Sequence, residues 1–161
     1  MQTFLTYASQ DFMHTARSLD RQRLNKQALE AWQIMMTNLK IDPDGNHREP
    51  RGWRNHPAVK MWDGYEITLY KYIKAMTDEW HYRGYNTSIL SKAHETVERG
   101  IELDLIQTDA IPLWMRDQDL YSEIVQSHRV ALLVKDYNWY SQWNWPEDNG
   151  IRPDSYDYVW V

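Results

Sequence analysis

The apolar positions of the first forty residues recur at steps of three and four. One series runs from Phe12 to Leu19, and a second series, shifted by one residue, runs from Leu24 to Leu39. Such steps place side chains on one face of a helix. Asp11 precedes the first series and is a residue type that caps helix N-termini. We therefore predict one long helix, or two helices joined by a slight bend, over residues 12–39.

The next segment predicts a loop followed by the clearest helix of the chain. The residues from Ile41 to His56 are rich in Pro, Gly and Asn, as loops are. Pro57 suits the first turn of a helix, with Asn55 or His56 as its cap. An apolar stripe then extends to Trp80, and Gly84 marks its end. A second main helix over residues 57–84 is the expected structure.

The remaining residues predict a shorter helix over 88–100 and a last main helix over 118–135. The C-terminal residues 136–161 are aromatic and interrupted by Pro, so we expect an irregular tail packed over the helices. No segment shows strong strand alternation. We expect an all-α fold, with residues 1–161 forming a single compact domain of three main helices and an irregular aromatic-rich C-terminal tail.

Composition narrows the class of protein. The 161 residues suit one domain, and the absence of Cys excludes disulfides and thiolate metal sites and favours the cytoplasm. No apolar run of about 18 residues predicts a membrane span. Nine Trp and eleven Tyr stand beside two Phe; these rings either stack on bases or fill the core. The net charge of −5 argues against a protein that coats DNA but permits a local basic patch.

Three titratable residues lie on apolar faces or at a helix start. Glu66 interrupts the stripe of the second main helix and is either hydrogen-bonded in the core or an active-site acid. His128, between Val125 and Leu132, has the same two interpretations. His56 lies at a helix start, which favours the neutral ring. No HxxxH or HExxH spacing occurs, so we expect no metal site.

A basic stretch from Arg17 to Lys26 flanks the apolar stripe of the first helix. Arg23, Gln27 and Glu30 lie on one helical face. This face is either a solvated, salt-bridged surface or a site that holds phosphate through Arg side chains.

Several stretches, in order along nearly the whole chain, resemble one family. They are "MQTFLTY", "LDRQRLNKQALEA", "GWRNHPAVKMWDGYE", "EWHYRGYN", "SHRVALLVKDYNWYSQ" and "YDYVWV". The order of these segments is similar to that of the pyrimidine dimer DNA glycosylase family, of the phage endonuclease V type, and the closer likeness is to a bacterial and phage branch of it.

The resemblance implies an all-α enzyme that removes a damaged pyrimidine and then cuts the strand by β-elimination. In this family an N-terminal amine attacks the sugar C1′ and a helix glutamate assists. Residue 2 here is the bulky Gln2, so we expect Met1 to be retained and to supply the amine. Arg23 stands where the family has its glutamate, which leaves Asp20, Glu30 or Glu66 as substitutes.

These considerations define a candidate site. The candidate catalytic residues are Met1, Glu30, Glu66 and His56. The candidates for holding phosphates and bases are Gln2, Arg21, Arg23, Lys26, Gln27, Arg129, Lys135, Trp139 and Tyr140.

The expected function is a DNA glycosylase acting on a damaged or modified pyrimidine, with abasic-site lyase activity. The alternatives are a non-lyase relative that binds or cleaves a nucleotide or modified base, and a protein-binding inhibitor module. We expect no cofactor, DNA or a nucleotide as partner, no membrane association, and a monomer.

Overall fold

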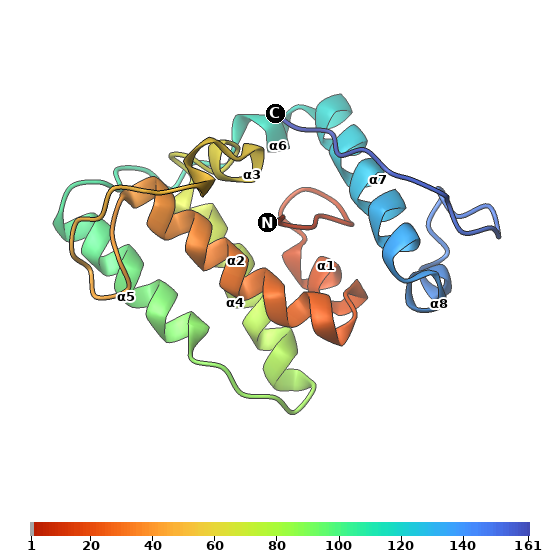
Figure 1. The fold of residues 1–161 in the computed structure, drawn as a ribbon, viewed down its shortest axis with the longest axis horizontal. Coiled ribbons are helices and arrows are strands. Elements are labelled where there is room, and N and C mark those ends of the chain that lie inside the picture. The colour runs from red at the N-terminus through yellow and green to blue at the C-terminus, as the bar shows by residue number, and fades with distance from the viewer. Residues whose placement is uncertain (1) are drawn as a thin grey trace.

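All regular elements in the described part of the chain are helical. The computed structural model describes residues 2–161, which confirms the all-α prediction for that range (Figure 1). The α-helices are α1 (Phe12–Ser18), α2 (Arg21–Leu39), α3 (Pro57–Lys60), α4 (Glu66–Tyr82), α5 (Ile89–Glu102), α6 (Leu113–Arg116), α7 (Gln118–Lys135) and α8 (Tyr137–Tyr140). Short 3-10 turns cover Trp53–Asn55 and Ser141–Trp143.

The first predicted helix is divided at residues 19 and 20, in agreement with the two-helix alternative. Leu19 has an extended backbone, with φ −74° and ψ 139°, and ends α1. The Asp20 side chain then accepts hydrogen bonds from the backbone N–H groups of Gln22 (2.9 Å) and Arg23 (3.1 Å). These bonds satisfy amides that a helix start leaves free, so a new helix begins here.

The second main helix was predicted as one element over residues 57–84, and this was wrong. A turn over residues 61–65 separates α3 from α4. Gly64 adopts φ +80°, a left-handed conformation that glycine tolerates without steric cost. The apolar stripe continues across the turn because Trp62 remains fully buried. The count of three main helices was also too low, since α2, α4, α5 and α7 each have 14 residues or more within the described chain.

The helices form two groups with the N-terminal segment between them. Helix α2 packs on α4, α5 packs against both, and α1 packs on α4. Helix α7 packs with α6 and α8 on the other side of residues 2–7 (Figure 1). No helix in the described residues is long and apolar enough to cross a membrane.

The N-terminal segment is buried yet has no regular structure, so side chains satisfy its amides. Residues 2–6 are all buried. Each backbone N–H in this run donates to a side-chain atom, as buried amides require. The pairs are Gln2 to Glu30 Oε2 (3.0 Å), Thr3 to Gln2 Oε1 (2.8 Å), Phe4 to Gln27 Oε1 (2.7 Å), Leu5 to His128 Nδ1 (3.0 Å) and Thr6 to Thr15 Oγ1 (3.2 Å). Helices α1, α2 and α7 therefore meet on this segment.

The C-terminal tail runs back along α7 towards α3 (Figure 1). The N–H of Val159 donates to Ser127 Oγ at 3.2 Å, and the Arg152 guanidinium donates to the carbonyl of Val134. The tail was predicted to be irregular and packed over the helices, and this is confirmed for residues 144–161. Its first residues instead form α8 and a 3-10 turn.

Removal of the Tyr72 hydroxyl tests the anchoring of the N-terminal segment. This hydroxyl lies 2.6 Å from Gln27 Oε1 and 3.0 Å from the Phe4 carbonyl oxygen, and Tyr72 is fully buried. Tyr72→Phe leaves buried acceptors without this donor, so we expect the free energy of unfolding to fall by about 1–3 kcal/mol. Tyr70→Phe on the same helix is the control, since no hydrogen bond of its hydroxyl is recorded in the described residues. Equal urea unfolding curves for the two variants contradict the expectation.

Stability should depend on pH through His128. Burial lowers the pKa of this fully buried ring from 6.5 to about 3. Below 6.5 the unfolded chain takes up a proton that the native protein refuses until about pH 3. The free energy of unfolding therefore falls as the pH falls through this window, by up to about 1.4 kcal/mol per pH unit. His128→Gln lacks this titration, so its profile should be flatter; parallel profiles would show that the expectation is wrong.

Candidate functional site

A cavity of about 440 Å³ opens beside the N-terminal segment. We call it the N-terminal cavity. Its lining residues are Gln2, Phe4, Gln22, Arg23, Lys26, Gln27, Glu30, His56, Lys135, Tyr156, Tyr158 and Trp160. They come from the N-terminal segment, one face of α2, the start of α3, the end of α7 and the tail. Seven residues of the sequence-based candidate site are thus brought together.

Helix α2 supplies the charged wall of this cavity. Arg23, Lys26 and Glu30 recur at helical steps and line it together. The Arg23 guanidinium is held by Asp20, with 2.6 Å between Nη1 and Oδ2. No ion pair of Lys26 is recorded within residues 2–161. The Glu30 carboxylate accepts the N–H of Gln2 at 3.0 Å. Among the described residues, Arg23 is therefore fixed by an ion pair, Lys26 has none, and Glu30 is the single acid of the lining and faces Gln2.

His56 caps α3 and lines the cavity with its ring. Its Nδ1 accepts the N–H of Ala58 at 3.1 Å, so the neutral ring carries its proton on Nε2. Burial lowers the pKa of His56, which favours this neutral form. The ring centroid lies 5.2 Å from that of Trp53 and 5.8 Å from that of Trp160, both edge to face. His56 can therefore donate a hydrogen bond into the cavity, and its neutral form has no free nitrogen lone pair to act as a base.

The tail forms an aromatic wall that the sequence analysis missed. Tyr156, Tyr158 and Trp160 all line the cavity. Alternate residues of an extended chain point to one side, and this places the three rings together. Lys135 Nζ donates to the Tyr156 hydroxyl at 2.7 Å, and this bond lowers the pKa of Tyr156. The signal that could have revealed this wall is the every-second-residue aromatic pattern of "YDYVW", which is short and lies outside any predicted strand.

Glu66 does not line the N-terminal cavity. It is the first residue of α4, and its Oε1 accepts the N–H of Gly64 at 3.0 Å. Burial raises the pKa of Glu66, while the backbone N–H donors lower it. The acid on the apolar stripe thus closes the turn before α4. This geometry favours the structural interpretation over the catalytic one.

Tyr140 and Trp139 also lie away from the cavity. The Tyr140 hydroxyl donates to Asp20 Oδ2 at 2.5 Å, and the ring is fully buried. Trp139 Nε1 donates to the carbonyl of Ser18 at 2.8 Å. Both residues fasten α8 to the junction of α1 and α2. In this arrangement they hold the start of α2, and Tyr140 acts on the site through Asp20 and Arg23.

Arg129 and Arg21 are engaged elsewhere as well. Arg129 Nε donates to the Thr6 carbonyl at 2.8 Å, and its Nη1 lies 3.6 Å from Glu147 Oε1. It thus secures the N-terminal segment. The guanidinium carbon of Arg21 lies 4.7 Å from the centroid of the Tyr85 ring, and neither residue lines the N-terminal cavity.

The predicted catalytic arrangement begins at the N-terminus of the chain. Met1 lies outside the described residues, so its expected role stays a prediction. Gln2 is buried, and its backbone nitrogen is fixed at Glu30. Gln27 lines the cavity, and its Oε1 accepts hydrogen bonds from the N–H of Phe4 and the hydroxyl of Tyr72. Among residues 2–161 no group of three or more His, Asp or Glu side chains is placed to hold a metal ion.

Comparison with known proteins gives one result for this chain. No curated protein and no solved structure matches it. The family model described as pyrimidine dimer DNA glycosylase matches residues 1–93, which is 93 of 161 residues and so more than half of the chain. The matched part contains the N-terminal segment, α1 to α4 and the charged wall of the cavity, whereas Lys135 and the aromatic tail lie beyond it. The chain therefore belongs to the pyrimidine dimer DNA glycosylase family.

Proposed function

We propose that this protein removes a damaged or modified pyrimidine from DNA and cleaves the resulting abasic site through its N-terminal amine. One observation carries the proposal. The backbone nitrogen of residue 2 lies 3.0 Å from the Glu30 carboxylate, in a cavity that also contains Arg23 and Lys26. Covalent geometry keeps the amine of the preceding residue within about one residue length, ~3.8 Å, of this nitrogen.

The proposed chemistry uses the amine as nucleophile. An α-amine has a pKa of about 7.7–8.0, so a useful fraction is unprotonated near neutral pH. Its nitrogen bonds to the deoxyribose C1′, the C1′–N bond to the base breaks, and the base leaves with a proton. Opening of the sugar ring gives an iminium ion. Loss of a C2′ proton and cleavage of the C3′–O bond then cut the strand, and water releases the amine.

Glu30 is the acid that we assign to this chemistry. It is the only carboxylate in the cavity lining, and it already faces residue 2. A carboxylate there stabilises the iminium charge and can accept the C2′ proton. The family's acid position is occupied by Arg23, seven residues and about two helical turns before Glu30. The proposal therefore moves the acid along the same face of α2.

Substrate binding is assigned to the cations and rings around the cavity. Arg23 is held in place by Asp20, and such a fixed guanidinium suits a phosphate. Lys26 and Lys135 add positive charge at the rim. Cavities of 300 Å³ and more accommodate small ligands, so about 440 Å³ suits one extrahelical nucleotide stacked on the tail rings.

Glu30→Gln separates chemistry from folding. The amide can still accept the N–H of Gln2, so the N-terminal segment should stay in place. We expect single-turnover cleavage of abasic-site DNA to fall by about 10²–10⁴-fold, with DNA affinity kept. Glu123→Gln, which removes an exposed charge from α7, is the matched control. Borohydride should trap the wild-type protein on this DNA, with the adduct in its N-terminal peptide.

The amine itself is tested by acetylation of the N-terminus, which removes the nucleophile and should abolish trapping. An adduct on an internal lysine contradicts the assigned nucleophile. Absence of any adduct, with binding of a mononucleotide detected by thermal shift, supports a relative without lyase activity instead. Cleavage by Glu30→Gln at the wild-type rate removes Glu30 from the proposal.

Lys26→Ala tests the role of the free cation at the rim. We expect weaker binding to DNA regardless of its sequence, and a salt dependence of log Kd that is shallower by about one unit of slope. Lys71→Ala is the control, because Lys71 is paired with Asp109 at 2.8 Å on another face. The measurement is fluorescence anisotropy with labelled duplex at several salt concentrations. Identical slopes for the two variants count against a phosphate contact at Lys26.

A further inference from the structure

Residues 48–54 of the loop that joins α2 to α3 include three Arg side chains for which no ion pair is recorded in residues 2–161. We call residues 41–56 the basic loop. The loop has three acids, Asp42, Asp44 and Glu49, and three cations, Arg48, Arg51 and Arg54; Lys60 of α3 follows. Within residues 2–161 no ion pair is recorded for these four cations. Glu49 lies 3.2 Å from His47 Nε2 and 4.0 Å from Lys40 Nζ.

Of the two acids at the tip of this loop, Asp42 shapes the turn. Asp42 Oδ1 accepts the N–H groups of Asp44 and Asn46, each at 2.9 Å, and so closes the turn. Arg48 and Arg51 lie after this turn and are exposed. In the described part of the chain these guanidinium groups have no recorded ion pair, so residues 48–54 form a local positive surface on a protein whose net charge is −5.

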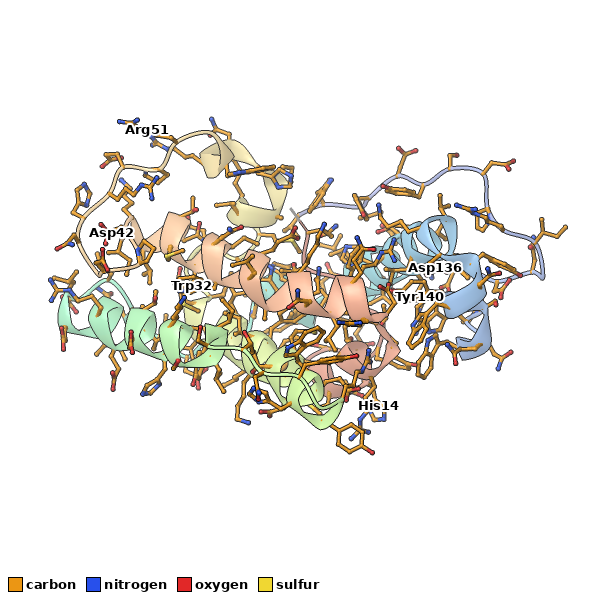
Figure 2. The ribbon with its side chains drawn as sticks, turned by 60° about the horizontal axis from the view of Figure 1, so that its bottom comes forward. His14, Trp32, Asp42, Arg51, Asp136 and Tyr140 are labelled. Atoms are coloured by element: carbon orange, nitrogen blue, oxygen red, sulfur yellow. The ribbon has the colours of Figure 1, made fainter. Side chains whose placement is uncertain are left out.

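The basic loop and α2 enclose a second cavity of about 380 Å³, which we call the loop cavity. Arg48 and Arg51 line it, together with Trp32, Met36 and Trp53. Trp53 keeps 50% of its surface exposed. Figure 2 shows Arg51 at the outer edge of the loop and Trp32 on α2. Guanidinium groups beside an exposed indole suit a chain of phosphates and flat rings.

Aromatic rings in edge-to-face contact connect the two cavities. Trp53 of the loop cavity lies 5.2 Å, between ring centroids, from His56 of the N-terminal cavity. His56 lies 5.8 Å from Trp160, which also lines the N-terminal cavity. A nucleic-acid strand with one nucleotide in the N-terminal cavity would therefore pass the basic loop on one side of that nucleotide.

We propose that the basic loop is a second DNA-contact site, where Arg48 and Arg51 hold phosphates that flank the target nucleotide and Trp53 offers a stacking face. That these phosphates flank the target nucleotide rests on the proposed function, in which the target nucleotide binds in the N-terminal cavity. The acidic remainder of the protein repels DNA, so this loop also fixes which way the strand runs across the site.

The test uses the double variant Arg48→Gln/Arg51→Gln in the full chain. Both side chains are exposed, and the backbone N–H of Arg48 keeps its bond to the Lys40 carbonyl. Arg17→Gln/Arg116→Gln is the control, because it removes the same charge from exposed positions that line neither cavity. Duplexes of about 30 base pairs carry an abasic site near one end, with the long flank on the 5′ or the 3′ side.

The double variant should bind one of the two duplexes about 10–100-fold more weakly at low salt, with a salt slope shallower by about two units, and should bind the other like the control. Trapping by borohydride on a short duplex of about 15 base pairs should persist. Equal losses in the variant and the control, on both duplexes, overturn the loop site even if trapping is intact. Loss of DNA binding in the variant without any wild-type trapping instead overturns the proposed function and keeps the loop as a DNA contact.

Discussion

The structure depends on the need to hydrogen-bond five buried backbone amides that no strand partner serves. Residues 2–6 cross the interior as irregular chain, and each of their N–H groups finds a side-chain acceptor. A buried amide without a partner costs about 1–3 kcal/mol. Gln27, Glu30 and His128 are therefore fixed in position by the segment that they support, and α2 and α7 are joined through it. The N-terminal cavity lies beside the first residues of this segment, Gln2 and Phe4.

Because of this constraint, the polar residues around the site are of two kinds: some support the N-terminal segment, and others remain available to a ligand. Gln27 through Oε1, His128 through Nδ1 and Arg129 through Nε each bind the backbone of the N-terminal segment and support it. Glu30 belongs to both kinds, because its bond to Gln2 places a carboxylate at the nitrogen where a family nucleophile would be. Lys26 and Lys135 at the rim remain available to a ligand, Lys26 without a recorded ion pair in residues 2–161 and Lys135 through a hydrogen bond to a tyrosine hydroxyl. The N-terminal segment that holds the fold together is thus also the segment at which the proposed chemistry takes place.

The acidic charge of the protein is compatible with DNA because its distribution is uneven. Some acids are paired with local cations: Asp109, in the loop after α5, with Lys71 of α4, and Asp78 of α4 with Lys74. Arg23 and Lys26 of α2 line the N-terminal cavity, and Arg48 and Arg51 of the basic loop line the loop cavity. Net charge describes the far field, whereas phosphate binding depends on groups within about a Debye length, ~8–10 Å. A protein with a negative net charge can therefore have a locally positive surface that binds DNA.

The sequence alone determined the helical class, α5 and α7 and most of α2, since local periodicity encodes which face of a helix is buried. It also located Glu30, Arg23, Lys26 and His56 as candidates. It did not determine the division of the second helix, because an apolar stripe continues across the turn at Gly64. Nor did it determine that Glu66 closes that turn, that Arg129 and Tyr140 face structural partners, or that Tyr156, Tyr158 and Trp160 complete the cavity. The turn at Gly64 is a local feature that the continuous apolar stripe concealed, whereas the partners of Arg129 and Tyr140 lie more than a hundred positions away, at Thr6 and Asp20. Local pattern carries no record of such pairs, so only the tertiary structure decided them.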